Sequence, residues 1–202
     1  AKNVGDCGTV ALNNRIQKVA NPNYGNKVFL RSGDTVFFEG DFIIQKVNNY
    51  KAELDVKSMD HWKCEFYSNQ EDKPTTFIAN GETGIVKEIY QSYMIIDFDG
   101  IMVKYYPSDL NMIGLGYSIT IHKSQGSSIK AVILVSPQNH IFMLNSNLLY
   151  VGLTRMKEVC YHLGTLQSVN QAVGKKANVT RNTWMQHLLT TMSEDEYHVP
   201  EL

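Results

Sequence analysis

The spacing of apolar residues divides the chain into segments with different predicted structures. Near the start, Asn21 precedes a proline, which disfavours helical backbone, and the apolar residues before it recur at helical spacing: Val10, Leu12, Ile16 and Val19. We therefore expect a helix over residues 10–19.

The segments after this helix have different patterns. Residues 36–47 mix Phe, Ile and Val around a Gly-Asp pair, which predicts two short strands joined by a turn. Residues 53–75 show no clear period and predict a surface loop or hairpin.

Two turn dipeptides mark the most regular part of the chain. Asn80-Gly81 and Asp99-Gly100 supply the positive φ angles of tight hairpins, and both lie beside β-branched and aromatic runs. They predict a three-strand meander over 84–89, 93–98 and 101–106. Short strands at this spacing suit a small barrel better than a parallel sheet. We therefore expect an all-β insertion over residues 76–112.

After this insertion the pattern becomes that of an α/β protein. Residues 117–124 predict a helix with Gly126 as its C-cap. The uninterrupted apolar run 131–135 predicts a buried central strand. Ser146 is positioned to cap a helix that runs to about Lys157.

The remaining C-terminal segments follow the same alternation. Residues 159–163 predict another strand, and residues 181–192 predict an amphipathic helix. The acidic tail 193–202 is expected to fray. The chain therefore reads as an α/β domain interrupted by a small β domain.

Composition narrows the class of protein without naming a partner. The 202 residues have a formal net charge of −1, so any nucleic-acid site must be a local basic or aromatic surface. The three cysteines, Cys7, Cys64 and Cys160, form no metal-binding spacing and predict a reduced, cytoplasmic protein. From that spacing we expect no metal site. No apolar run is long enough for a membrane span, so we expect no membrane partner.

Three stretches of the chain carry specific motifs: residues 40–50 with 80–84, residues 116–127, and residues 148–157. Together they resemble the RecD-like DNA helicases of superfamily 1. Residues 40–50 (GDFIIQKVNNY) followed by 80–84 (NGETG) are similar to that family's GD…NNY…NGE segment. Residues 116–127 (GYSITIHKSQGS) are similar to helicase motif V, and residues 148–157 (LLYVGLTRMK) to motif VI. The order and spacing of the three make the joint match specific, and the resemblance spans about residues 5–190.

The resemblance implies a fold and a division into domains. The fold is α/β: a RecA-like domain of the P-loop NTPase type that lacks its own P-loop and is interrupted by a small SH3-like β barrel. Residues 1–75 and 113–192 would form the RecA-like domain, 76–112 the SH3-like insertion, and 193–202 a flexible tail.

The resemblance also implies half of an ATPase site. This chain has no Walker-type phosphate loop, so ATP and Mg²⁺ would be held chiefly by an N-terminal RecA-like domain of the same chain, and the isolated fragment is expected to be inactive. Arg155 of motif VI would act as the arginine finger, stabilising charge on the transferred phosphoryl group. Taken alone, Arg155 also fits a solvated arginine on a helix face.

Motif V would lie between ATP and DNA. The resemblance puts the DNA-side candidates at the start of the motif: Thr120, His122, Lys123 and Ser124. It puts the nucleotide-side candidates at the end: Gln125, Gly126, Ser127 and Ser128, the last standing where many relatives have a ribose-binding Glu. Without the motif, Gly126 would be a simple helix cap and His122 a packed or solvated histidine.

Aromatic residues in the β-rich half have two interpretations each. Tyr50 could stack a base while Asn48 and Asn49 bond to phosphate or base edges, or the three could form a plain turn. The insertion could guide DNA strands, or it could be a peptide-binding barrel that uses its tyrosines: Tyr90, Tyr93, Tyr105 and Tyr106.

The leading hypothesis is the C-terminal half of an ATP-dependent DNA helicase or translocase that moves single-stranded DNA, in the 5′ to 3′ direction if it follows its relatives. Its partners would be single-stranded DNA, the N-terminal RecA-like domain and, in some relatives, subunits of a recombination nuclease. The alternative is a non-enzymatic module that binds single-stranded nucleic acid or protein. A motor that translocates without unwinding is a third possibility.

Overall fold

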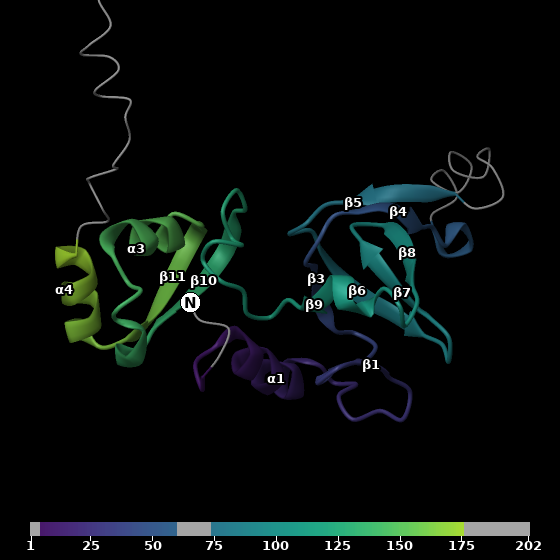
Figure 1. The fold of residues 1–202 in the computed structure, drawn as a ribbon, viewed down its shortest axis with the longest axis horizontal. Coiled ribbons are helices and arrows are strands. Elements are labelled where there is room, and N and C mark those ends of the chain that lie inside the picture. The colour runs from purple at the N-terminus through teal and green to yellow at the C-terminus, as the bar shows by residue number, and fades with distance from the viewer. Residues whose placement is uncertain (1–4, 60–73, 176–202) are drawn as a thin grey trace, which may run out of the picture.

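The computed structural model describes residues 5–59 and 74–175, which form two units and a helix that contacts both (Figure 1). The β unit contains strands β1 to β9. The α/β unit contains β10, β11, α3 and α4. The predicted helix over 181–192, the tail 193–202 and Cys64 lie outside the described residues.

The opening helix is confirmed as α1 (Thr9–Ala20), and it ends at the extended Asn21 before the proline. Its docking is polar rather than apolar. Val10 and Val19 are exposed, whereas Gln17 is buried. Gln17 Nε2 donates to the buried carboxylate of Asp41 at 2.6 Å, so a hydrogen bond holds the helix against the β unit.

Asp41 accepts four hydrogen bonds and joins three segments of the chain. Besides Gln17, its donors are Asn21 Nδ2 at 2.6 Å, the Phe38 amide at 2.8 Å and the Tyr117 hydroxyl at 3.0 Å. Burial and the Asp41 charge raise the pKa of Tyr117 to about 12. A buried carboxylate is tolerated here because each donor offsets part of its desolvation.

The β unit is built on one antiparallel sheet and two short hairpins. The sheet has the order β8-β7-β6-β3-β9, with β3 (Phe42–Gln45) between β6 (Thr83–Ile89) and β9 (Ile113–Leu115). Strands β7 (Met94–Phe98) and β8 (Ile101–Tyr105) complete the predicted meander. The hairpins pair β1 (Leu30–Ser32) with β2 (Thr35–Phe37) and β4 (Asn49–Glu53) with β5 (Thr75–Ile78).

Turn chemistry fixes the β7–β8 connection as predicted. Asp99 and Gly100 have φ angles of 53° and 82°, the left-handed pair that a two-residue hairpin needs. The Gly100 amide donates to Asp97 Oδ1 at 2.5 Å and closes the turn. The local signal was sufficient here because the turn needs only neighbouring residues.

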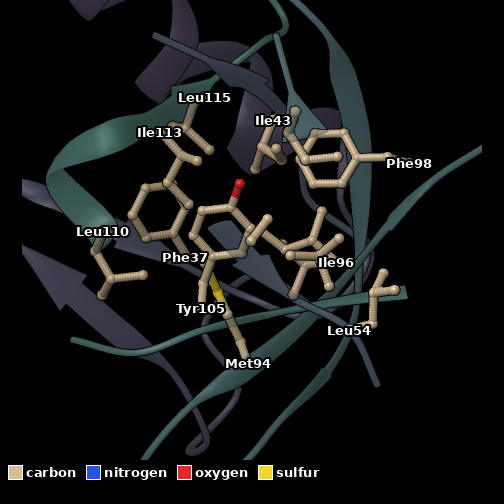
Figure 2. Close-up of a cluster of buried hydrophobic side chains, with 14 of the residues drawn as sticks. Phe37, Ile43, Leu54, Met94, Ile96, Phe98, Tyr105, Leu110, Ile113 and Leu115 are labelled. Atoms are coloured by element: carbon tan, nitrogen blue, oxygen red, sulfur yellow. The ribbon is translucent and has the colours of Figure 1, made fainter. Parts of the chain in front are cut away.

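The compact β unit is larger than the predicted insertion over 76–112. Strands β3 and β9 pair with each other and extend the same sheet on either side of that range. One apolar core joins the early and the late strands, from Phe37 and Ile43 to Ile113 and Leu115 (Figure 2). Residues 37–59 therefore pack with the β unit, because long-range strand pairing brings them there. Whether this unit is an SH3-like barrel stays a prediction.

The α/β unit has two parallel strands with helices beside them. Strand β10 (Ile129–Ser136) pairs with β11 (Met156–Gly164), and α3 (Ser146–Leu153) connects them. Helix α4 (Leu166–Gly174) follows and packs with α3. Short 3₁₀ turns occur at Val56–Ser58, Leu110–Met112 and Gln138–His140.

Three predictions in this region were wrong in detail. Residues 117–124 form successive turns and no helix, consistent with the low helical preference of the β-branched run 119–121. Helix α3 ends at Leu153, four residues before Lys157, and Asn145 is its N-cap instead of Ser146, with its Oδ1 2.9 Å from the Leu148 amide. Strand β10 is only partly buried, since the described sheet has just two strands.

Candidate functional site

The motif V segment is a looped turn held at its start by α1. The side chain of Asn13 makes two hydrogen bonds with the backbone of Ser118, donating to the carbonyl at 2.9 Å and accepting from the amide at 2.7 Å. Ile121 then enters the small core of the α/β unit. These two anchors fix the turn between the β unit and the parallel strands.

The predicted DNA-side residues of this turn fall into two groups. His122 and Lys123 are exposed, and Thr120 is half-buried. Ser124 is buried, and its hydroxyl donates to the Ile121 carbonyl at 2.8 Å. Ser124 therefore stabilises the turn from inside, while the other three side chains are open to a ligand.

The predicted nucleotide-side residues form the exposed end of the same turn. Gln125, Gly126, Ser127 and Ser128 are all exposed. Gly126 has a φ of 86°, which L side chains rarely adopt, and no heavy atom lies within 4 Å of the position that a Cβ would occupy. The backbone at Gly126 is thus accessible to an approaching ligand.

Arg155 lies in the short connection between α3 and β11, not on an exposed helix face. Arg155 is half-buried as a residue, and its guanidinium donates three hydrogen bonds, to the carbonyls of Val151 at 3.2 Å and Ser127 at 3.1 Å and to the hydroxyl of Thr154 at 3.3 Å. The bond to Ser127 joins the motif VI segment directly to the end of motif V.

A close approach of α3 to β10 brings these two segments together. A Cβ at Gly152 would lie 2.9 Å from Leu134 Cδ1 and 3.5 Å from Ile121 Cδ1. Glycine at this position therefore lets the helix that precedes Arg155 pack tightly against β10 and the motif V turn.

The third predicted group, Asn48, Asn49 and Tyr50, lies at the start of β4. Asn48 is engaged locally, since its Oδ1 accepts from the Asn80 amide at 2.8 Å and its Nδ2 donates to the Tyr50 hydroxyl at 3.0 Å. Tyr50 is 70% exposed and stacks on Phe77 of β5, with ring centroids 5.1 Å apart. An exposed stacked aromatic pair is a surface on which a base could lie.

Sequence reasoning missed two residues beside these candidates. Phe77 was not singled out because its partner Tyr50 is 27 positions away and only strand pairing brings them together. Lys46 follows β3, and partial burial and the charge of Lys123 lower the pKa of its ammonium group. Two mutually repelling lysines make this junction favourable for an anion.

The described residues contain no group of three His, Cys, Asp or Glu side chains that could hold a metal ion. Within the same ranges, no helix has the length and apolar character required to cross a membrane.

Comparison with known proteins agrees with this arrangement. The UvrD-like helicase C-terminal domain family matches residues 115–161, which include the motif V turn, α3 and Arg155. An ATP-dependent RecD2 DNA helicase of Deinococcus radiodurans is 28% identical over 179 residues, covering 89% of this chain and 21% of that protein. The RecBCD enzyme subunit RecD of Mycobacterium tuberculosis is 38% identical over 61 residues, 30% of this chain and 11% of that subunit.

Among solved structures, a Pif1 helicase from Bacteroides in complex with ADP-AlF3 and ssDNA superposes with a TM-score of 0.51 at 14% identity, covering 90% of this chain and 42% of that one. This likeness supports the α/β, RecA-like fold class. The chain spans only about a fifth of the RecD2 relative. The family match and the RecD relatives together show that this chain is similar to the C-terminal domain of RecD-like helicases of superfamily 1.

Proposed function

We propose that this chain supplies the C-terminal half of the motor of an ATP-dependent DNA helicase or translocase, with Arg155 as its arginine finger. The observation that carries this proposal is the hydrogen bond from Arg155 to the Ser127 carbonyl, since it unites motifs V and VI at one exposed point. The relatives named ATP-dependent helicase and RecD support the same function.

The guanidinium of Arg155 is suited to meet a phosphate. A guanidinium has five N–H donors, and three are used by acceptors of this chain, so two remain for a ligand. The three internal bonds hold the planar group in place before a ligand arrives, which is how a fixed cation stabilises charge that develops in a transition state.

The nucleotide would be bound at a cleft shared with another domain. We expect the phosphate loop and the Mg²⁺ ligands to come from an N-terminal RecA-like domain, because this sequence has no Walker-type loop. Bound ATP would supply the phosphoryl group for hydrolysis. This chain would contribute Arg155 and the exposed backbone from Gln125 to Ser128.

Single-stranded DNA would follow the exposed residues at the opposite end of the motif V turn. Lys123 and Lys46 offer charge to phosphates, His122 and Thr120 offer hydrogen bonds, and Tyr50 offers a stacking surface. The DNA-side and nucleotide-side residues share one turn. A movement of Arg155 away from Ser127 would therefore displace the backbone of this turn and, within a few residues, the side chains proposed to contact DNA. This is a direct route for coupling hydrolysis to movement.

The alternative function is a module that binds single-stranded nucleic acid or protein without hydrolysing ATP. The exposed Tyr50–Phe77 pair favours it, since stacking needs no nucleotide. ATP turnover by the longest natural chain containing this segment, measured with and without oligo-dT, separates the two. We expect turnover that rises with oligo-dT, whereas DNA binding without turnover would support the binding module and contradict the helicase proposal.

A further inference from the structure

A second aromatic surface lies on the β unit, where Tyr90 is exposed and two neighbouring tyrosines are half-buried. We call it the tyrosine row: Tyr90 in the β6–β7 connection, Tyr93 just before β7, and Tyr106 just after β8. The rings of Tyr90 and Tyr93 stack with centroids 4.7 Å apart, and those of Tyr93 and Tyr106 are 5.9 Å apart. Tyr105 was expected with this group, but it is fully buried and donates to Gln45 Oε1 at 2.7 Å.

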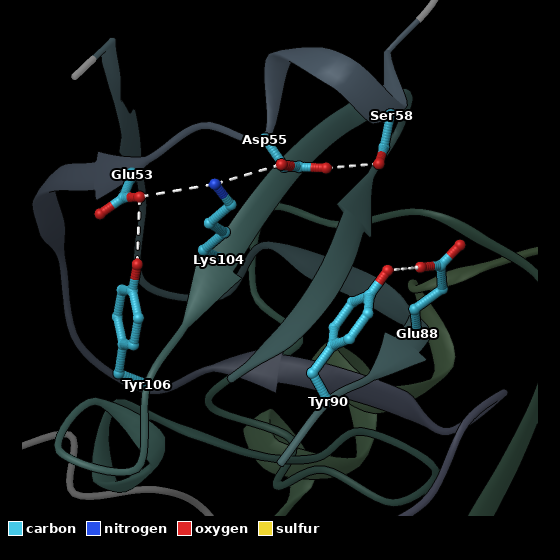
Figure 3. A network of polar contacts seen from close by, with 7 residues as sticks. All are labelled: Glu53, Asp55, Ser58, Glu88, Tyr90, Lys104 and Tyr106. Atoms are coloured by element: carbon cyan, nitrogen blue, oxygen red, sulfur yellow. Dashed lines mark hydrogen bonds and ion pairs between the residues drawn. The ribbon is translucent and has the colours of Figure 1, made fainter. Parts of the chain in front are cut away.

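A carboxylate bounds each end of the tyrosine row. The Tyr90 hydroxyl donates to Glu88, and the Tyr106 hydroxyl donates to Glu53 at 3.1 Å (Figure 3). Both phenol oxygens have thereby used their protons and can only accept further hydrogen bonds. The Glu88 carboxylate raises the pKa of Tyr90 to about 12, as expected where negative charge is concentrated.

The surface already binds one cation of this chain. Lys104 Nζ lies 3.2 Å from Asp55, 3.6 Å from Glu53 and 5.8 Å from the centre of the Tyr93 ring. Beside it is a hollow of about 290 Å³ lined by Lys104 itself, by Tyr93, by the segment from Glu53 to Lys57 and by Pro74. Glu53 and Asp55 pair with Lys104, and Lys57 lines the same hollow, while Glu88 lies at the other end of the row against the Tyr90 hydroxyl. The row as a whole thus has three carboxylates and two lysines. The arrangement therefore leaves negative charge in excess.

This charge disfavours a nucleic acid and favours a basic partner. Phosphates would be repelled by the carboxylates at both ends of the row, whereas guanidinium groups can pair with carboxylates and stack on tyrosine rings. The two ring separations keep the centres of the Tyr90 and Tyr106 rings within about 11 Å of each other. One turn of a polyproline II helix, about 9 Å for three residues, fits within that limit. Aromatic rows are a common surface for such helices.

We propose that the tyrosine row is a docking site for a partner protein's extended segment with basic residues three positions apart and proline between them. One basic side chain would pair with Glu88, the other with Glu53, and proline would pack on Tyr93. This site shares no residue with the ATP and DNA residues proposed above, so a partner bound there would leave the residues of the motor free.

The test is fluorescence anisotropy of a labelled peptide containing Arg-Pro-Pro-Arg, titrated with the longest natural chain that includes this segment. We expect saturable binding, weakened about tenfold by Glu88→Lys and by Tyr90→Ala, because each removes one anchor worth about one decade in Kd. Glu39→Lys makes the same charge change on an exposed residue outside the row and should alter Kd less than twofold. Glu88→Gln serves if the reversed charge impairs folding, and the far-ultraviolet circular dichroism spectrum reports whether each variant is folded, independently of ATP turnover.

Several results would overturn the proposal. Equal weakening by Glu88→Lys and Glu39→Lys would mean non-specific charge attraction, and no binding by the wild type at millimolar protein would mean no site. Displacement of the peptide by oligo-dT, with weaker oligo-dT binding by Tyr90→Ala, would assign the row to nucleic acid instead. Failure of the helicase proposal would show only as absent ATP turnover, so the two proposals fail separately.

Discussion

The two units of this chain differ in how completely they bury their apolar residues. The β unit encloses fifteen buried apolar side chains, while the α/β unit has a core of six within the described ranges. Strands β10 and β11 leave large apolar side chains in solvent, with Ile133 65%, Tyr161 61% and Leu163 56% exposed. Parallel strands are normally covered on both faces.

From this difference in burial we expect the β unit to be stable by itself and the α/β unit to depend on its surroundings. Exposed apolar groups on a parallel sheet mark a surface that another part of an assembly covers. A RecA-like motor with its ATP site between two domains has such a requirement. The α/β unit, which holds Arg155, is therefore expected to gain order from its neighbours, and the β unit to be the stable partner.

The largest expected effect is on the β-unit core. Ile96 is fully buried on β7, an inner strand of the five-stranded sheet, so Ile96→Ala should lower the free energy of unfolding by about 2–5 kcal/mol. Leu148→Ala in the α/β core should cost less, because that side chain retains some exposure. Hydrogen exchange should show loss of protection in residues 37–115 for Ile96→Ala alone. Equal loss in both units would show that they unfold as one.

Substitution of one glycine in each unit should show the same difference between the two units, with a smaller loss of stability than Ile96→Ala. A Cβ at Gly84 would lie 2.8 Å from the Asp97 carbonyl within the sheet, and one at Gly164 would lie 2.6 Å from the Ser136 carbonyl at the end of β11. Gly84→Ala and Gly164→Ala should each cost about 1–3 kcal/mol by crowding the backbone. Gly84→Ala should cost more, since a strand end can move and a central strand cannot. Urea unfolding of the two variants checks the order, and the reverse order would contradict it.

The smallest effect is expected at the N-cap of α3. Asn145→Ala removes the acceptor for the Leu148 amide and should cost about 1 kcal/mol, confined to the α/β unit. Asn145→Asp keeps an acceptor at that place and should restore most of the loss. Thermal unfolding of the two variants measures both changes. If Asn145→Asp were no more stable than Asn145→Ala, the side-chain hydrogen bond to the Leu148 amide would not stabilise α3.

How well the sequence predicted each feature depended on the range of the interaction involved. The Asp99-Gly100 hairpin and the end of α1 at Asn21 were predicted because the responsible residues are neighbours in the chain. The polar docking of Gln17 on Asp41 and the pairing of β3 with β9 join residues far apart in sequence, so periodicity could not reveal them.

The candidate site shows the same limit. Motif resemblance identified Arg155 and Ser127 separately, but their hydrogen bond depends on the packing of α3 against β10. The inward orientation of Ser124 and the Tyr50–Phe77 stack also required the three-dimensional structure. Roles of these residues in binding remain predictions for experiment.

The most direct measurement is single-strand-stimulated ATP turnover by the longest natural chain, comparing wild type, Arg155→Ala and Lys157→Ala. Lys157 lies in β11, two residues after Arg155, and is an exposed cation, so it serves as the matched control. We expect Arg155→Ala to lose about 10³-fold or more in kcat while retaining DNA binding, and Lys157→Ala to keep near wild-type turnover. Unchanged turnover in Arg155→Ala would contradict the half-site on which this account rests.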